Sequence, residues 1–236
     1  MINVLMLIMF RGVGQQGQLG HGNLESMAEP TQILKLTEGK HCIAAVTCGI
    51  AHTFFLTDLG QLLACGQNKY GALGVDTTAE PVVLPTFIEV NFQEDAKIGQ
   101  GQGASRIVHI SCGGAHTAVV DSRGRLYTTG SNTCGQLGLN HFEDYLCSFS
   151  QVTTFSGEAC TDEHVVRDLQ TREELYGKQD LPVCAYVSCG EEFTAVITRD
   201  HSVYTVGLGL GKIDIARSIV RLLFSFNFMI SCSFLL

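Results

Sequence analysis

The chain has 236 residues, a formal net charge of −8 and 26 glycines, but no tryptophan. This length suffices for one large domain or two small ones with a substantial core. The acidic balance, with no run of Lys and Arg, disfavours binding of nucleic acid by the whole surface. Many glycines without a collagen-like period indicate many tight turns, and hence many short strands.

The N-terminal segment Met1–Phe10 is apolar, but it lacks the basic start and small-residue cleavage site of a signal peptide. We interpret it as an edge strand that leads into the first glycine loop. Reduced thiols are therefore expected for the ten cysteines, in the cytoplasm or the nucleus. Cys48, Cys112 and Cys189 each precede a glycine at one repeated position, which predicts a small buried residue in a recurring strand.

A glycine-rich segment follows, and it matches the dinucleotide-binding fingerprint at Gly12, Gly14 and Gly17. That fingerprint requires a helix next, whereas Gly20 and Gly22 follow here and the same segment recurs twice further along the chain. A later segment, 207–212, lacks the spacing of a phosphate-binding loop and the Ser or Thr after its lysine. We therefore predict no cofactor site.

Three markers recur in the same order along the chain. The first is a Cys-Gly turn, the second is an acidic turn before a short strand that ends in glycine, and the third is a glycine loop. The glycine loops lie at 12–20, 66–74 and 130–138, with a shorter copy at 207–211; the Cys-Gly turns lie at 48–53 and 112–117, with a weaker copy at 189–194. An internal repeat of this kind decides the fold class before any single motif does.

Short runs rich in β-branched and apolar residues lie between the markers, each bounded by Gly or Asp. The predicted strands are 43–48, 52–57, 61–65 and 81–90 in one unit, 106–112, 116–120 and 125–129 in the next, and 183–189, 193–198 and 202–206 in the third. A further strand is expected after each glycine loop. Roughly four short antiparallel strands per unit are typical of a β-propeller blade.

Two further residue types recur within the glycine loops. Leu19, Leu73 and Leu137 share one position, and we expect them to fill the space between neighbouring blades. Asn68 and Asn132 also share a position, and their side chains can bond the backbone of their own loop.

Over about residues 10–211, this combination resembles the repeats of the regulator of chromosome condensation family, whose full members close seven blades into a ring. The resemblance implies an all-β fold, a partial β-propeller of the chromosome-condensation-regulator type with about three and a half four-stranded repeats in residues 1–211. Two features depart from the family. The tryptophan frequent before the repeat glycine is replaced by Cys65, Thr129 and Val206, and the repeats are too few to close a ring, as in a truncated member.

The pairs Cys48–His52 and Cys112–His116 each leave three residues between two candidate zinc ligands. A structural zinc site needs four ligands, and a Cys–His catalytic dyad would occur once rather than at the repeat period. We therefore interpret both histidines as turn residues whose rings bond neighbouring backbone. The sequence predicts no metal site and no catalytic residue, and hence no enzyme.

Two long connections, Asp76–Gln102 and Asn140–Pro182, are candidates for function. Each is either a solvated surface loop, the second with a short helix near Val165, or a partner-binding protrusion. Residues 212–236 form a divergent apolar tail, in which Leu222–Leu236 is short for a membrane span. The tail is either the divergent end of a truncated chain or a tail anchor.

The favoured function is a protein–protein interaction module, a scaffold or adaptor whose binding residues the sequence does not assign. The resemblance implies partners such as small GTPases or ubiquitin-pathway proteins. The alternatives are a guanine-nucleotide exchange factor for a small GTPase, none of whose exchange loops maps onto this chain, and a tail-anchored membrane adaptor. An open arc leaves two apolar faces and free strand edges, so we expect marginal stability, aggregation or association with another chain.

Overall fold

The computed structural model describes residues 8–33, 42–75, 83–90, 105–139, 143–153, 182–200 and 202–208. The regular elements in these ranges are strands and one short 3-10 turn, which confirms the all-β prediction. They are β1 Met9–Gly12, β2 Met27–Gln32, β3 Ile43–Cys48, β4 His52–Thr57, β5 Leu62–Gln67, η1 Lys69–Gly71, β6 Val83–Glu89, β7 Ile107–Cys112, β8 His116–Asp121, β9 Leu126–Ser131, β10 Tyr145–Gln151, β11 Cys184–Cys189, β12 Phe193–Thr198 and β13 Val203–Gly207.

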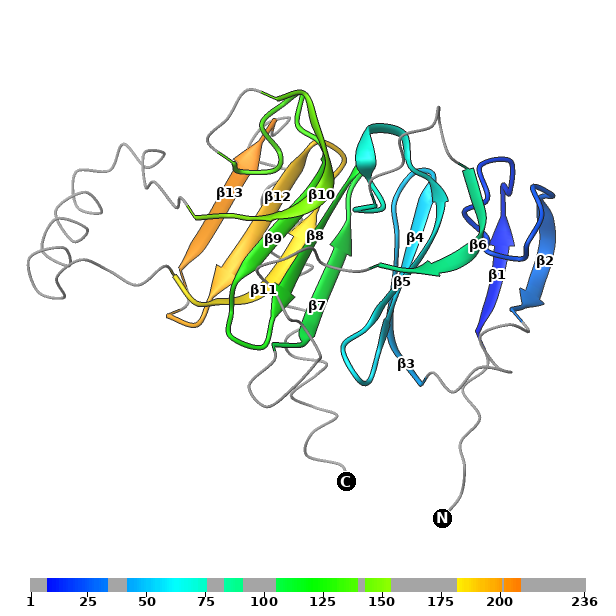
Figure 1. Ribbon diagram of the computed structural model, residues 1–236, viewed down its shortest axis with the longest axis horizontal. Helices are drawn as coiled ribbons and strands as arrows, with labels where there is room; N and C mark the ends of the chain where they lie inside the picture. The colour runs from blue at the N-terminus through cyan, green and yellow to red at the C-terminus, as the bar shows by residue number, and fades with distance from the viewer. Residues whose placement is uncertain are drawn as a thin grey trace, which may run out of the picture.

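The strands form four antiparallel sheets that stand side by side (Figure 1), from β1–β2 at one end to β11–β13 at the other. We call them blade 1 (β1, β2), blade 2 (β3 to β6), blade 3 (β7 to β10) and blade 4 (β11 to β13). Within each complete blade the strands follow chain order from an inner strand to an outer one. Contacts between β3 and β7, and between β7 and β11, place the inner strands next to one another. The partial propeller is therefore confirmed.

The predicted strands agree closely with the observed ones. β3, β4 and β12 have the predicted bounds, and β2, β6 and β10 are the strands expected after each glycine loop. Each inner strand also contains an irregularity in register at one repeated place, between Ile43 and Ala45, Ile107 and His109, and Cys184 and Tyr186. This recurring bulge was not predicted, because an extra residue in a strand leaves only a weak trace in the sequence pattern.

The core lies between the blades. All six residues of β4, β8 and β12 are buried. In β4 and β8, successive side chains point to opposite faces and each face meets a neighbouring sheet. The cluster between blades 2 and 3 joins Phe54 and Leu62 to Val119 and Tyr127. Leu73 belongs to the same cluster and, like Leu137, is fully buried. The glycine-loop leucines therefore fill the space between blades, as predicted.

The ends of the arc differ from the expectation of two open apolar faces. Val46 and Cys48 of β3 are exposed, because blade 1 contains only β1 and β2 among the described residues. The predicted burial therefore holds for Cys112, is partial for Cys189 and is wrong for Cys48. At the other end, Phe193, Ala195 and Ile197 point away from blade 3 and are nevertheless buried. The expected open apolar face is therefore not found at β12.

Each of the two long connections contains a strand. β6 divides Asp76–Gln102, and β10 lies within Asn140–Pro182. The rest of both connections falls mainly outside the described residues, as do the predicted helix near Val165 and the tail 212–236. Within the described ranges no helix is long and apolar enough to cross a membrane.

Substitution of a Cys-Gly turn glycine tests how tightly the turns pack. A Cβ at Gly113 would collide with Cε1 of His116 and crowd Gly190 O, so we expect Gly113→Ala to lower the free energy of unfolding by about 2–3 kcal/mol. Gly135→Ala is the matched control. Its φ of 74° would strain an alanine, but no atom lies within 4 Å of the new Cβ, so the substitution causes no collision. It should cost only about 1 kcal/mol. Urea unfolding measures both, and equal losses would contradict steric contact as the cause.

Candidate interaction surface

The second strand of each complete blade begins with a His-Thr pair whose two side chains point to opposite faces. In blade 3, the Thr117 hydroxyl reaches back to blade 2, where it lies 2.9 Å from Ala72 O and 3.0 Å from His52 Nε2. In blade 4, Thr194 repeats this arrangement, at 2.8 Å from Gln136 O and 2.9 Å from His116 Nε2. We call this three-residue contact between blades the Thr–His link.

The hydrogen bonds of the link fix the state of the imidazole. A threonine hydroxyl has one proton, which Thr117 donates to Ala72 O, so its oxygen accepts a hydrogen bond from His52 Nε2–H. His52 therefore carries a proton on Nε2. Burial lowers the pKa of His52 from 6.5 to about 4, because a charged ring is poorly solvated there. The pKa of buried His116 is likewise lowered to about 4, mainly by burial and further by His52.

A third copy of the threonine contact joins blades 1 and 2, where the Thr53 hydroxyl donates to Gln18 O at 2.8 Å. In all three copies the acceptor is the carbonyl of the loop residue just before the glycine-loop leucine. The prediction that the histidine rings bond neighbouring backbone missed this contact with a threonine of the next blade. The threonine was visible within the repeated turn, but the sequence alone does not show which blade it reaches.

The glycine of each Cys-Gly turn is required by the ring that follows it. A Cβ at Gly49, Gly113 or Gly190 would collide with the ring of His52, His116 or Phe193 respectively. Successive turns are also bonded to one another, since Ile50 N–H donates to Gly114 O at 3.3 Å and Gly114 N–H donates to Glu191 O at 3.0 Å. The turns therefore form a continuous row across blades 2, 3 and 4.

The glycine loops also behave as predicted at their asparagines. Asn68 Oδ1 accepts the N–H of Leu73 at 2.9 Å, and Asn132 Oδ1 accepts the N–H of Leu137 at 3.2 Å. In both candidate zinc pairs and Cys–His dyads, the cysteine ends an inner strand and the histidine starts the second strand of the same blade. No group of three metal-ligating side chains occurs among the residues that the structure describes.

The Cys-Gly turns and the glycine loops lie at the same end of the strands, which we call the turn face (Figure 1, upper edge). Its described turns and loops carry one cation, Lys69, and five acidic residues: Glu25, Glu143, Asp144, Glu191 and Glu192. Exposed apolar and aromatic side chains also gather there, and these are Val13, Leu24, Ile50, Tyr70, Tyr145 and Leu208. Acidic groups beside exposed aromatic rings are suited to contact with a basic protein surface.

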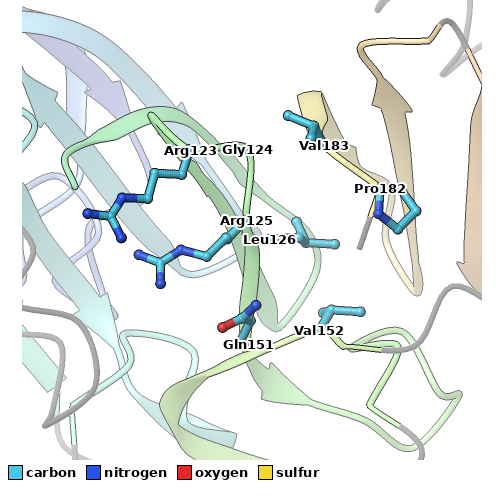
Figure 2. Close-up of a pocket in the computed structure, with 8 residues that line it drawn as sticks. All are labelled: Arg123, Gly124, Arg125, Leu126, Gln151, Val152, Pro182 and Val183. Carbon is cyan, nitrogen blue, oxygen red and sulfur yellow. The ribbon is translucent and has the colours of Figure 1, made fainter. Parts of the chain in front are cut away.

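The opposite face carries the turns between the second and third strands, and it is more basic. Arg125 pairs with buried Asp121 at 2.6 Å. A hollow of about 40 Å³ lies between blades 3 and 4. In Figure 2, Leu126 and Val152 lie across from Val183, while the Arg123 and Arg125 side chains extend away from the hollow. Binding sites for small molecules usually measure about 300 Å³ or more, so this hollow suits a water molecule rather than a cofactor.

Comparisons with known proteins identify the family of these repeats. Two family models, both described as the regulator of chromosome condensation (RCC1) repeat, match residues 11–56 and 60–120, and 43–72 and 107–136. The chain belongs to the RCC1 repeat family. These ranges contain the Thr–His link formed by Thr117, Ala72 and His52, and the glycine loops at 12–20 and 66–74.

The RCC1 repeats of this chain resemble parts of longer proteins. The serine/threonine-protein kinase Nek9 of Xenopus laevis is 33% identical over 84% of this chain and 18% of its own length. The protein RCC2 homolog of Danio rerio is 29% identical over 84% of this chain and 37% of its own. Yeast RCC1 (Prp20), solved bound to Kap60, matches with a TM-score of 0.63 at 20% identity, over 88% of this chain and 42% of its own. The chain thus spans well under half of these relatives.

Cys65, Thr129 and Val206, which replace the tryptophan frequent in the RCC1 family, lie close to the glycine loop of the preceding blade. Cys65 and Thr129 face the glycine loop of the preceding blade: the Cys65 thiol lies 3.6 Å from Gln18 O and the Thr129 hydroxyl lies 3.0 Å from Gly71 O. A Cβ at Gly138, in the loop of blade 3, would lie 3.3 Å from Cγ1 of Val206. Small side chains here let the loops approach closely.

The buried histidines make stability depend on pH. Their pKa values are lower in the folded protein, so the unfolded chain binds more protons; stability is full above pH 6.5 and falls as the pH drops towards 4. Between about pH 7.5 and pH 5, each histidine should remove about 2 kcal/mol from the free energy of unfolding. His116→Phe, which copies Phe193 of blade 4, should roughly halve this loss. Urea unfolding at several pH values is the measurement, and an unchanged pH dependence in His116→Phe would exclude His116 as one of its sources.

Proposed function

We propose that this chain is a protein-interaction module that binds its partner through the turn face, and that it acts by binding rather than by catalysis. The observation that supports this most directly is the division between repeated and variable residues. The repeated His, Thr and Gly are occupied in contacts between blades. The positions that vary between repeats, such as Ile50, Gly114 and Glu191, lie on the turn face, and two of these three are exposed.

The chemistry of the turn face favours a protein partner with a basic surface. Aromatic rings provide contact area at low entropic cost, and exposed carboxylates direct association with cationic groups. The small hollow on the opposite face offers little to a metabolite. A relative, yeast RCC1, was solved bound to Kap60, a protein partner. We extend protein binding, and the small GTPases or ubiquitin-pathway proteins that the family resemblance implies, to this chain as part of the proposal.

A photo-crosslinking pair tests the turn face. Ile50 and Leu59 are 67% and 66% exposed, and both lie in turns of blade 2, at opposite ends of β4. A crosslinking amino acid at position 50 should capture partner protein at least about tenfold more than one at position 59, since contacts concentrate within one patch. Mass spectrometry of the adducts in cells gives the comparison. Equal capture from both positions, or more from position 59, would exclude the turn face.

Guanine-nucleotide exchange on a small GTPase is the second proposal, supported by the match between acidic loops and a basic GTPase surface. It predicts that the protein accelerates release of labelled GDP from one member of a GTPase panel. Charge reversal at Glu191 and Glu192 should then slow association about tenfold at low salt, whereas reversal of Asp58 on the opposite face should not. Stopped-flow fluorescence measures the release, and absence of acceleration across the panel removes the exchange proposal but leaves the binding proposal in place.

A further inference from the structure

The contact between blades 2 and 3 carries a pair of exposed tyrosines on the turn face. Tyr70 comes from η1 in the glycine loop of blade 2, and Tyr145 is the first residue of β10 in blade 3. Their ring centroids are 6.2 Å apart with planes inclined at 57°, and the residues are 39% and 51% exposed. At the equivalent contact between blades 1 and 2, the corresponding residues are Gln16 and Val83. The aromatic pair is therefore an addition to the repeat rather than part of it.

The two tyrosines are held by the scaffold beneath them. The Thr129 hydroxyl lies 3.0 Å from both Gly71 O in η1 and Leu146 O in β10, so it joins the segments that carry the two rings. A Cβ at Gly71 would collide with the backbone of Leu146 and Cys147, which shows how closely the loop lies on β10. Because both rings stand on packed backbone, little order has to be created when a partner binds.

The charges around the pair indicate what would bind. Lys69 Nζ lies 4.8 Å from the centroid of the Tyr70 ring, so one ring already holds a cation. Glu143 and Asp144 immediately precede Tyr145 and are exposed. Their backbone is fixed by Asn132, whose N–H donates to Asp144 O at 2.7 Å and whose Nδ2 donates to Glu143 O at 3.0 Å. The backbone that carries the two carboxylates is thus fixed immediately before Tyr145 in the chain.

We propose that Tyr145, with Glu143 and Asp144, forms a docking site for a basic protein segment that presents an arginine. A guanidinium can stack on the Tyr145 ring and pair with a carboxylate at the same time, which a lysine ammonium does less well. Tyr70 and its Lys69 form the rim of the site and favour an approach from the side of Tyr145. The site rests on the proposed function, because it assigns a chemistry to one part of the turn face.

The probe is a fluorescent peptide of alternating arginine and glycine, with a lysine version and a serine version as controls. Binding by anisotropy at about 50 mM salt should follow the order arginine, lysine, serine. Tyr145→Val, which installs the residue of the other inter-blade contact, should weaken arginine-peptide binding about fivefold, and Glu143→Gln with Asp144→Asn about tenfold. Tyr70→Gln should change it less than about twofold, since Tyr70 lies at the rim.

The matched control is Asp58→Asn with Glu29→Gln, which removes the same charge from exposed positions outside the turn face, in blades 2 and 1. It should change the dissociation constant less than about twofold. Equal weakening by both double variants would show attraction to a diffuse acidic surface and overturn the site, as would an unaffected Tyr145→Val or absent binding of the arginine peptide. In these cases crosslinking from position 50 still decides the proposed function separately. Circular dichroism and thermal melting check that each variant stays folded.

Discussion

The structure depends on one hydrogen-bonded contact, the threonine hydroxyl that lies between a loop carbonyl and, in two of its three copies, an imidazole of the preceding blade. Leaving such buried groups unpaired would cost about 1–3 kcal/mol each, so the contact requires the next blade to sit at one distance and one register. Apolar clusters alone tolerate small slides of one sheet over another. The threonine converts a general attraction between apolar faces into a defined stacking of blades.

This contact also explains where the chain can vary. His52 and His116 are hydrogen-bonded to Thr117 and Thr194. The turn glycines cannot be replaced by a larger residue without a collision with the ring that packs on them. The two histidines that would attract attention as metal ligands or bases are therefore buried, and each bonds a threonine through Nε2. The residues that differ between repeats lie at the tips of turns and loops, where Ile50, Tyr70 and Tyr145 are exposed. Binding chemistry on such a scaffold is set by residues that the repeat does not constrain.

Much of the fold followed from the sequence because the repeat aligns with itself. Three aligned copies fixed the strands, the buried position of Leu73 and Leu137, and the loop role of Asn68 and Asn132. Contacts between blades were harder to predict from the sequence. Thr117 and His52 are 65 residues apart in the chain, and a local sequence pattern does not show that two such distant residues meet. The exposure of Cys48 was missed for the same reason: its burial depends on a neighbouring inner strand. The tyrosine pair was invisible because it joins two loops of different blades.

In blade 4, a phenylalanine at the position of the histidine alters the outward face of β12. Phe193 occupies the position of His52 and His116 and packs on Gly190 in the same way, but its ring cannot donate a hydrogen bond. The outward side of β12 is then entirely apolar, with Phe193, Ala195 and Ile197 in one cluster. Blades 2 and 3 require a hydroxyl opposite the histidine, whereas blade 4 requires only apolar contact. Whatever lies against β12 is thus selected by shape and apolar area, while the neighbour of a histidine-bearing blade is selected by a threonine at one position.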